Sequence, residues 1–191
     1  MPSNRGRRAI LLAALFIASA QAQDKANLCA ACHGPGGNST TSGVPSIAAQ
    51  PATFLELQLI LFREGLRDSP EMAPVAKGMS DAQIRALAKH FAALPARRAA
   101  SRDGDAALLK KGRELAAARH CGQCHLPDFR GQAQMPRLAG QREEYLAAQL
   151  RAYREGKRVG SDTSMNEAMY RVSDADIIAL AHFLSRSSVR R

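Results

Sequence analysis

The 191-residue sequence predicts an all-α protein made of two tandem domains. The first observation is periodicity: apolar residues recur at helical spacing, with no sustained two-residue alternation of the kind that indicates strands. The second is an internal repeat, in which residues of one half match residues 91 to 93 positions later. A repeat of this length indicates duplicated domains and not a solenoid of short units. The third is a five-residue motif that occurs once in each copy.

The repeat can be followed through most of each copy. The motif is offset by 92 residues, the middle of the copies by 91 and their last segment by 93, so small insertions account for the drift. The matched pairs are Pro45/Pro136, Gln50/Gln141, Phe54/Tyr145, Gln58/Gln149, Phe62/Tyr153, Gly65/Gly156, Ser80/Ser173, Asp81/Asp174, Ile84/Ile177 and Leu87/Leu180. We therefore divide the chain into a leader at 1–22, a first domain at 23–95, a linker at 96–104 and a second domain at 105–191.

Export is predicted by the first residues of the chain. Three arginines within 5–8 form a positive region, residues 9–18 are apolar, and Ala20-Gln21-Ala22 is a cleavage site of the A-x-A type. The apolar run is shorter than the roughly 20 residues that span a bilayer, although an uncleaved anchor remains the alternative. We expect a periplasmic protein that begins at Gln23, and export argues against a nucleic-acid partner.

A long helix is predicted in the middle of each copy. In the first copy Phe54, Leu57, Leu61 and Phe62 recur at helical spacing and Gly65 ends the run. The second copy repeats this pattern and stops at the matching glycine. Both copies therefore place an amphipathic helix before a glycine turn.

The last helix of each copy has a predicted start. Ser80 with Gln83 forms a capping box, and Ser173 with Asp176 occupies the same N-cap and N3 positions. The second copy also predicts a helix over 105–118. The first copy has only six residues between the predicted cleavage site and its motif, so we expect this helix to be nearly absent there.

The repeated motif predicts covalent haem. It reads Cys29-Ala-Ala-Cys32-His33 in the first copy and Cys121-Gly-Gln-Cys124-His125 in the second, and it contains every cysteine of the chain. In a C-x-x-C-H run the two thiols add to the porphyrin vinyl groups and the histidine binds the iron. We therefore expect two covalently bound haem c groups, each with its iron. A zinc site is the alternative for Cys and His, but the export signal and the methionine register oppose it.

The sixth iron ligand is assigned by register. Met72 and Met165 each precede the N-cap serine of their last helix by eight residues, and no other methionine pair matches. We expect both in loops and propose them as the axial partners of His33 and His125. The remaining methionines and histidines are interpreted as packing or surface residues: Met79, Met135, Met169, His90, His120 and His182.

These residues resemble the dihaem class I cytochromes c of the cytochrome c4 type over essentially the whole mature length. The strings that carry the resemblance are Cys29-Ala-Ala-Cys-His-Gly34, Pro136-Arg-Leu-Ala-Gly-Gln141, Tyr145-Leu-Ala-Ala-Gln-Leu150, Arg154-Glu-Gly-Lys-Arg158 and Ser173-Asp-Ala-Asp-Ile177. The resemblance implies two domains packed as a pseudo-twofold pair, His/Met ligation of both haems and electron delivery to terminal oxidases. It also implies that the carbonyls of Pro45 and Pro136 accept hydrogen bonds from the proximal imidazoles. Leu126, where the first copy has a glycine, and Ala49, where the second has a glycine, depart from the pattern.

Coordination predicts the function. An iron with His and Met on its two axes has no vacant position for oxygen or a small-molecule substrate, so we expect an electron carrier and not an enzyme. The donor would be a cytochrome bc-type complex and the acceptor a terminal oxidase. Two alternatives remain: an electron-transfer subunit of a periplasmic dehydrogenase, and a dihaem enzyme with an open haem.

Charge predicts where partners dock. Residues 23–96 contain six Lys and Arg against six Asp and Glu, whereas residues 97–191 contain eighteen against eleven, a net charge of +7. Such an asymmetry can steer association with an acidic redox partner or with an anionic membrane surface. A solvated surface without a partner is the plain alternative.

Overall fold

The computed structural model describes residues 25–97, 103–158 and 163–189. Its helices in chain order are residues 25–33, the 3-10 turn η1 (Pro35–Gly37), α2 (Ala52–Arg63), α3 (Met72–Ala76), α4 (Asp81–Ala93), α5 (Ala106–Ala118), α6 (Cys121–His125), α7 (Glu143–Arg154), α8 (Ser164–Met169) and α9 (Asp174–Arg186). Extended pairing in these ranges is limited to an isolated bridge between Gln132 and Met135. The all-α prediction is confirmed. The predicted leader, 1–22, and the centre of the predicted linker lie outside the described residues.

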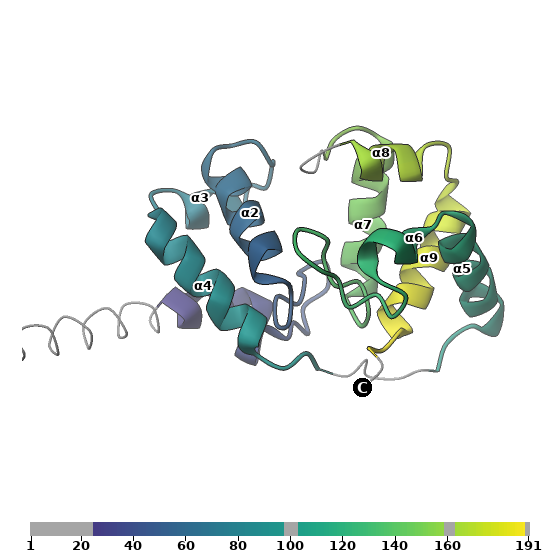
Figure 1. The fold of residues 1–191 in the computed structure, drawn as a ribbon, viewed down its shortest axis with the longest axis horizontal. Coiled ribbons are helices and arrows are strands. Elements are labelled where there is room, and N and C mark those ends of the chain that lie inside the picture. Colours follow the sequence, from purple (N-terminus) through teal and green to yellow (C-terminus); the bar gives the residue numbers. More distant parts are fainter. Residues whose placement is uncertain (1–24, 98–102, 159–162, 190–191) are drawn as a thin grey trace, which may run out of the picture.

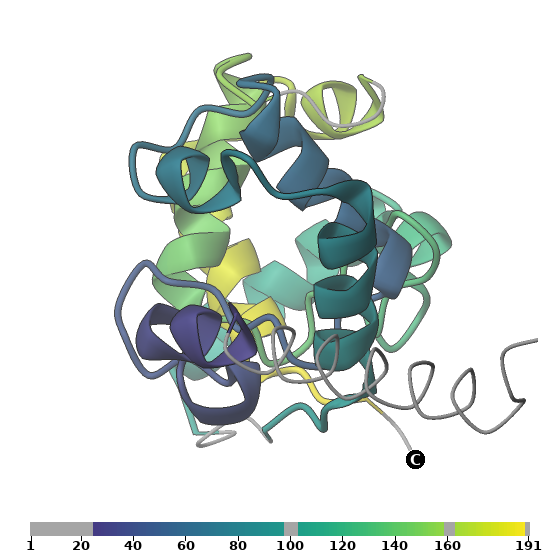
Figure 2. The same cartoon turned by 90° about the vertical axis from the view of Figure 1, so that its left-hand side faces the viewer.

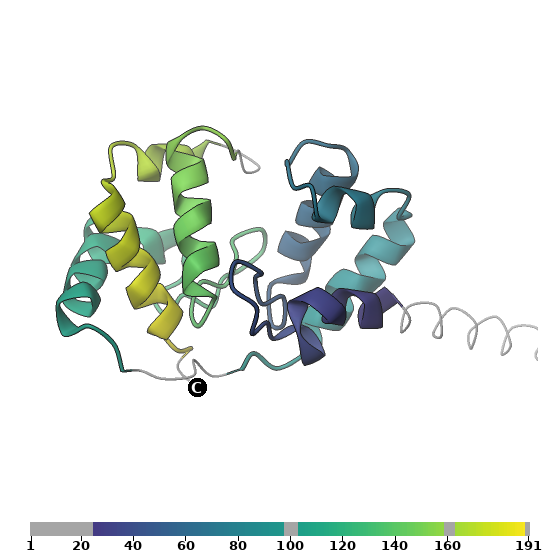
Figure 3. The same cartoon turned by 180° about the vertical axis from the view of Figure 1, so that it is seen from behind.

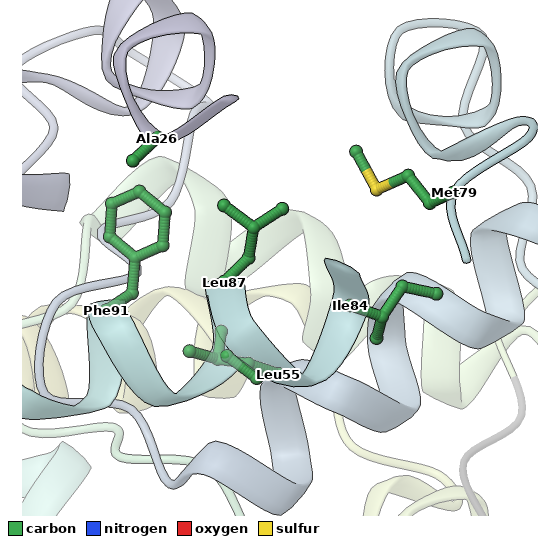
Figure 4. Close-up of a cluster of buried hydrophobic side chains, with 7 residues drawn as sticks. Ala26, Leu55, Met79, Ile84, Leu87 and Phe91 are labelled. Carbon is green, nitrogen blue, oxygen red and sulfur yellow. The ribbon is translucent and has the colours of Figure 1, made fainter. Parts of the chain in front are cut away.

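In the first domain α2 packs against both α4 and α3 (Figure 1). Its core consists of apolar side chains from four segments, including Leu55 on α2 and Phe91 on α4. Phe91 points toward Ala26 on the helix of residues 25–33, which ties the motif segment to the last helix (Figure 4). The buried members of this core are Ala26, Leu55, Met79, Ile84, Leu87, Ala88 and Phe91.

The second domain has the same plan with a fuller N-terminal helix. α9 packs against α5 and α7, which lie on two sides of it (Figures 1 and 3). Gly112 makes the close α5–α9 approach possible, because a Cβ there would come within 2.1 Å of the Ala179 carbonyl oxygen. The predicted helix over 105–118 is therefore present, with Asp105 as its N-cap.

Helix ends follow the local sequence signals. The Ser80 hydroxyl accepts from the Gln83 amide while the Gln83 side chain accepts from the Ser80 amide, which completes the capping box. Ser173 likewise accepts from the Asp176 amide at the start of α9. At the other end, Gly65 follows α2 with a φ of 68°, a left-handed conformation that costs glycine little.

The two domains meet through a reciprocal set of hydrogen bonds. Gln50 donates to the Arg137 carbonyl and accepts from the Arg137 amide, at 2.9 and 2.8 Å. Gln141 makes the same pair with the Ser46 carbonyl and amide, at 2.8 and 2.7 Å. Both glutamines and both partner residues are related by the 91-residue offset, so the two pairs are exchanged by a pseudo-twofold axis. α2 and α7 lie on the facing sides of the two domains (Figure 1).

In the first domain the attachment motif and the short helix α3 lie at opposite ends. Figure 2 shows residues 25–33, in purple, at the far end of the first domain from α3, and Figures 1 and 3 agree. The expected near-absence of an N-terminal helix in this domain concerns residues 23–28, and of these the described ranges include 25–28. Within them, residues 25–33 form a single helix that includes the motif.

Candidate haem-attachment sites

The first motif presents its thiols and imidazole from one short helix. Cys29 and Cys32 are one turn apart, half-buried and exposed respectively, and neither is in a disulfide. His33 is buried, and its Nδ1 lies 2.8 Å from the Pro45 carbonyl oxygen. Burial raises the pKa of the Cys29 thiol, which keeps it protonated near neutral pH.

The second motif repeats this arrangement on α6. Cys121 is half-buried, Cys124 is exposed, and both are free. The Nδ1 of His125 lies 2.8 Å from the Pro136 carbonyl oxygen, the same distance as in the first site. The two sites are therefore alike in each contact that orients the histidine.

This geometry fits a haem c group in both domains. Burial lowers the pKa of His33 and His125, so both imidazoles are neutral. A proton on Nδ1 is donated to the proline carbonyl, which leaves the Nε2 lone pair free to bind iron. In the described part of the chain, no group of three or more His, Cys, Asp or Glu is placed so that it could hold a metal ion.

The residue after each motif histidine adopts the same unusual backbone conformation. Gly34 has φ 79° and ψ 164°, and Leu126 has φ 68° and ψ 156°. This region is essentially reserved for glycine, and a residue with a side chain is strained there by roughly 1–3 kcal/mol. In the first domain a Cβ would also come within 2.3 Å of the Asn38 carbonyl oxygen. Leucine at position 126, where the first copy has Gly34, is therefore held in a strained backbone conformation next to His125.

The two register-matched methionines lie at corresponding places, although not in loops. Met72 begins α3 and Met165 is the second residue of α8, so the expectation of loops was wrong. Each lies in the first turn of a short helix that has no side-chain cap at its N-cap residue, although the Met72 amide donates to the Ser69 hydroxyl at 3.2 Å. Both side chains are half-buried. Met79 and Met169, by contrast, are buried in the two domain cores, in agreement with a packing role.

Two of the other three histidines have side-chain partners of their own. His90 packs edge-on against Phe91, with ring centroids 5.0 Å apart. His182 is buried, and its Nδ1 lies 3.1 Å from Glu143. His120 is exposed and lies immediately before α6, where its backbone is in the left-handed conformation with a φ of 56°.

Two arginines at the domain interface were missed by the sequence reasoning. Arg67 and Arg158 form hydrogen bonds with Gln58 and Gln149 from both domains. The glutamines were recognised as a repeat pair, but the arginines were not, although they too are 91 residues apart. Extending the register beyond Gly65 and Gly156 would have found them.

Comparison with known proteins agrees with this geometry. Residues 109–188 match the family model for cytochrome c, and residues 19–91 match that for subunit III of cbb3-type cytochrome c oxidase. The chain is 34% identical to the thiosulfate dehydrogenase electron acceptor of Thiomonas intermedia, over 97% of this chain and 92% of that protein. It is 31% identical to cytochrome c4 of Azotobacter vinelandii, over 87% of each.

Solved structures show the same architecture. Reduced recombinant cytochrome c4 from Pseudomonas stutzeri superposes with a TM-score of 0.80 at 30% identity, over 88% of this chain and 97% of that one. The thiosulfate dehydrogenase TsdBA from Marichromatium purpuratum matches with a TM-score of 0.73 at 30% identity, over 84% of this chain and 36% of that chain.

The protein is thus a dihaem cytochrome c with two cytochrome c domains, and it carries two covalently bound haem c groups. Electron transfer is the function of this class. More narrowly, the chain belongs to the cytochrome c4 family. None of the described helices is both long and apolar enough to cross a bilayer.

Proposed function

We propose that this protein is a periplasmic carrier that moves electrons by outer-sphere transfer toward a terminal oxidase. The observation that supports this most is the duplicated coordination set. Each domain supplies a buried, neutral histidine and, at the same register, a half-buried methionine on a short helix. An iron held on both axes exchanges electrons without binding a substrate.

The residues are assigned as follows. Thioether bonds form from Cys29 and Cys32 in domain 23–95, and from Cys121 and Cys124 in domain 105–191. His33 and Met72 bind the first iron, and His125 and Met165 bind the second. Pro45 and Pro136 hold the two imidazoles in the tautomer that iron requires. When bound, the haem supplies a one-electron ferric/ferrous couple, and the protein sets its potential.

Axial ligation is tested by carbon monoxide binding and redox titration of the reduced holoprotein. Wild type should bind no carbon monoxide at either haem. Met72→Ala and Met165→Ala should each open one haem, which then binds carbon monoxide and titrates at a lower potential. Met79→Leu and Met169→Leu, at the buried methionines, serve as matched controls and should leave both haems closed. If carbon monoxide bound readily to one haem of the wild type, that haem would have an open axial position. The protein would then be a dihaem enzyme and not a carrier.

Docking of the acceptor is proposed on the second domain. Residues 97–191 carry a net charge of +7. Exposed side chains such as Lys110 and Arg130, 80% and 59% exposed, contribute to this charge, although each lies beside a carboxylate, of Glu114 and Asp128. The net field of this domain should steer an acidic partner or an anionic membrane surface. Transfer rates to an oxidase should therefore fall with rising ionic strength, and rates that ignore salt would exclude this docking mode.

The periplasmic location depends on removal of the leader. We propose cleavage after Ala22, so that the mature chain begins at Gln23. Mass spectrometry of the protein isolated from the periplasm should find this N-terminus. A mass that retains residues 1–22, in a membrane fraction, would identify an anchored form instead.

A second candidate is the acceptor of a periplasmic dehydrogenase. The relative from Thiomonas intermedia is named a thiosulfate dehydrogenase electron acceptor, and the matching solved chain from Marichromatium purpuratum is a thiosulfate dehydrogenase. Stopped-flow reduction of this cytochrome by such a dehydrogenase with thiosulfate should then be fast and saturable. Co-purification of the two proteins would indicate that this cytochrome is a permanent subunit of the dehydrogenase. Slow reduction without saturation would rule out the dehydrogenase as its donor, and only the proposal of a carrier to an oxidase would remain.

A further inference from the structure

Asn166 joins the short helix α8 to the end of α7. Its Nδ2 donates to the Tyr153 carbonyl oxygen at 2.8 Å and to the Arg158 carbonyl oxygen at 3.0 Å. Tyr153 lies in the last turn of α7, where carbonyls lack their usual partner within the helix, and Arg158 lies just beyond the turn that follows. One side chain of α8 therefore binds two main-chain groups of the segment against which α8 packs (Figure 1).

The orientation of the Asn166 amide is set by these two partners. Both are carbonyl oxygens, which only the NH2 group can bond, so a flipped amide would place oxygen against oxygen. In this orientation Oδ1 is buried and, in the described part of the chain, has no hydrogen-bond partner. A buried acceptor without a partner is costly. The two donor bonds are therefore what asparagine contributes at this position.

The first domain has no such side chain at the corresponding position. Ala73 stands 93 residues before Asn166, and alanine cannot form a side-chain hydrogen bond. At the start of α3 the hydrogen bond to a side chain is local, from the Met72 amide to the Ser69 hydroxyl at 3.2 Å. The link from the methionine-bearing helix to the preceding long helix through this position is therefore specific to the second domain.

A different contact is common to both domains and shows that the asymmetry is local. Arg63 donates to the Met79 carbonyl oxygen at 2.9 Å, and Arg154, 91 residues later, donates to the Val172 carbonyl oxygen at 3.0 Å. These bonds hold the chain just before α4 and α9 in the same way. The helices α3 and α8 thus differ in how their first turns are held, while the segment after each is held alike.

We propose that Asn166 is a positioning residue for Met165 and keeps this methionine on the second iron against competing ligands. The inference rests on the proposed function, which assigns Met165 to that iron. Met165 and Asn166 are neighbours in the first turn of α8, which has six residues. A helix this short does not persist without contacts to the rest of the domain. The two bonds of Asn166 therefore fix the backbone from which the Met165 side chain extends.

The consequence is a difference in ligand exchange between the two haems. While α8 is held on α7, a methionine sulfur that leaves the iron stays close to it, at a high effective concentration, and rebinds before an outside ligand. In the first domain, where Ala73 makes no such bond, α3 is freer to carry Met72 away. An added ligand should therefore displace Met72 more readily than Met165.

The test is imidazole binding to the oxidised holoprotein, followed by the NMR signals of the iron-bound methionine methyl groups. Met72→Ala and Met165→Ala assign the two signals. Asn166→Ala, which installs the residue of the first domain, should lower the imidazole concentration that displaces Met165 by about tenfold, as expected for the loss of two neutral hydrogen bonds. The first haem should be unchanged.

Two further variants separate hydrogen bonding from packing. Asn166→Asp keeps the size of the side chain but cannot donate to the carbonyls, so it should behave like Asn166→Ala. Thr163→Val is the control on the same helix, since it removes only the exposed bond from the Thr163 hydroxyl to Glu167. The control should stay within about twofold of wild type. An aspartate variant that binds imidazole as wild type does would overturn the proposal.

The remaining outcomes also decide the matter. Wild type alone gives one answer without any variant: if imidazole displaced Met165 before Met72, the proposal would be wrong. If Met165→Ala left both methyl signals in place, Met165 would not be a ligand, and the proposed coordination would fail together with this inference. If Met165→Ala removed one signal but Asn166→Ala bound imidazole like wild type, only this inference would fail. Failure to reduce an oxidase would affect only the proposed function.

Discussion

Replacing Gln141 with alanine should separate the two domains. Its side-chain amide satisfies both main-chain groups of Ser46: it accepts from the Ser46 amide nitrogen at 2.7 Å and donates to the Ser46 carbonyl oxygen at 2.8 Å. Both bonds are buried, and Gln141 itself is 4% exposed. Alanine cannot replace either bond, so a buried main-chain donor and acceptor lose their partners at once.

The expected cost follows from these two contacts. Each lost bond removes a net stabilisation of about 1 kcal/mol, and leaving a buried partner unsatisfied costs about 1–3 kcal/mol. Partial rehydration at the interface limits the sum, so we expect about 2–4 kcal/mol. For a protein of this length that lowers Tm by roughly 5–15 °C. Gln50→Ala should lower the free energy of unfolding by a similar amount. The double variant should lower it by less than the sum of the two, because the first substitution already separates the domains and the second then removes fewer contacts.

Differential scanning calorimetry of the holoprotein checks this reasoning. Wild type should unfold in one transition that includes both domains, and Gln141→Ala should unfold earlier and in two. Gln134→Ala is the control, since this side chain is exposed and its loss should change stability by no more than about 0.5 kcal/mol. A single, unshifted transition for Gln141→Ala would show that the reciprocal bonds do not hold the domains together.

Other changes give equally direct outcomes. Leu126→Gly should stabilise the second domain by about 1 kcal/mol, because relief of the backbone strain exceeds the lost side-chain packing, and a lower Tm would contradict this. Gly112→Ala should destabilise it by about 1–3 kcal/mol, since the new Cβ meets the Ala179 carbonyl oxygen; urea unfolding measures the loss. Glu143 has a lowered pKa, despite burial that would raise it, because Arg186 and His182 bond to its carboxylate. Its contribution is present at neutral pH and is lost as pH falls through this lowered pKa, so wild type and Glu143→Gln should differ in Tm at pH 7 and converge once the pH is below that pKa.

Local signals in the sequence predicted the helices and their ends well. The capping serines, the glycine stops and the 91- to 93-residue offset are all short-range or repetitive, and they identified α4, α9 and the boundary of α2. The loop expectation for Met72 and Met165 was wrong because one turn of helix has no periodicity to detect. Such helices depend on packing with the rest of the domain, as α3 does against α2.

The domain interface was harder to predict, for a physical reason. A repeat shows that Gln58 and Gln149 correspond, but not that they meet, because contacts across a pseudo-twofold axis join residues from different copies. The roles of Arg67 and Arg158 depend on that meeting. The proline contacts were expected because the family resemblance implies them, and in the structure each joins a histidine and a proline of the same copy.

The glutamine bonds at the interface have a consequence for how the two halves could diverge. Gln50 and Gln141 contact the main chain of Arg137 and Ser46, so these two reciprocal pairs do not require a particular side chain at either position. Of these two residues, Arg137 also adds its side chain to the joint: the buried guanidinium donates to the Ala48 carbonyl of the first domain at 3.1 Å. Duplicated domains that recognise each other mainly through backbone groups can acquire different surfaces without weakening their interface. The neutral first half and the basic second half can therefore differ in charge while the same backbone contacts join them.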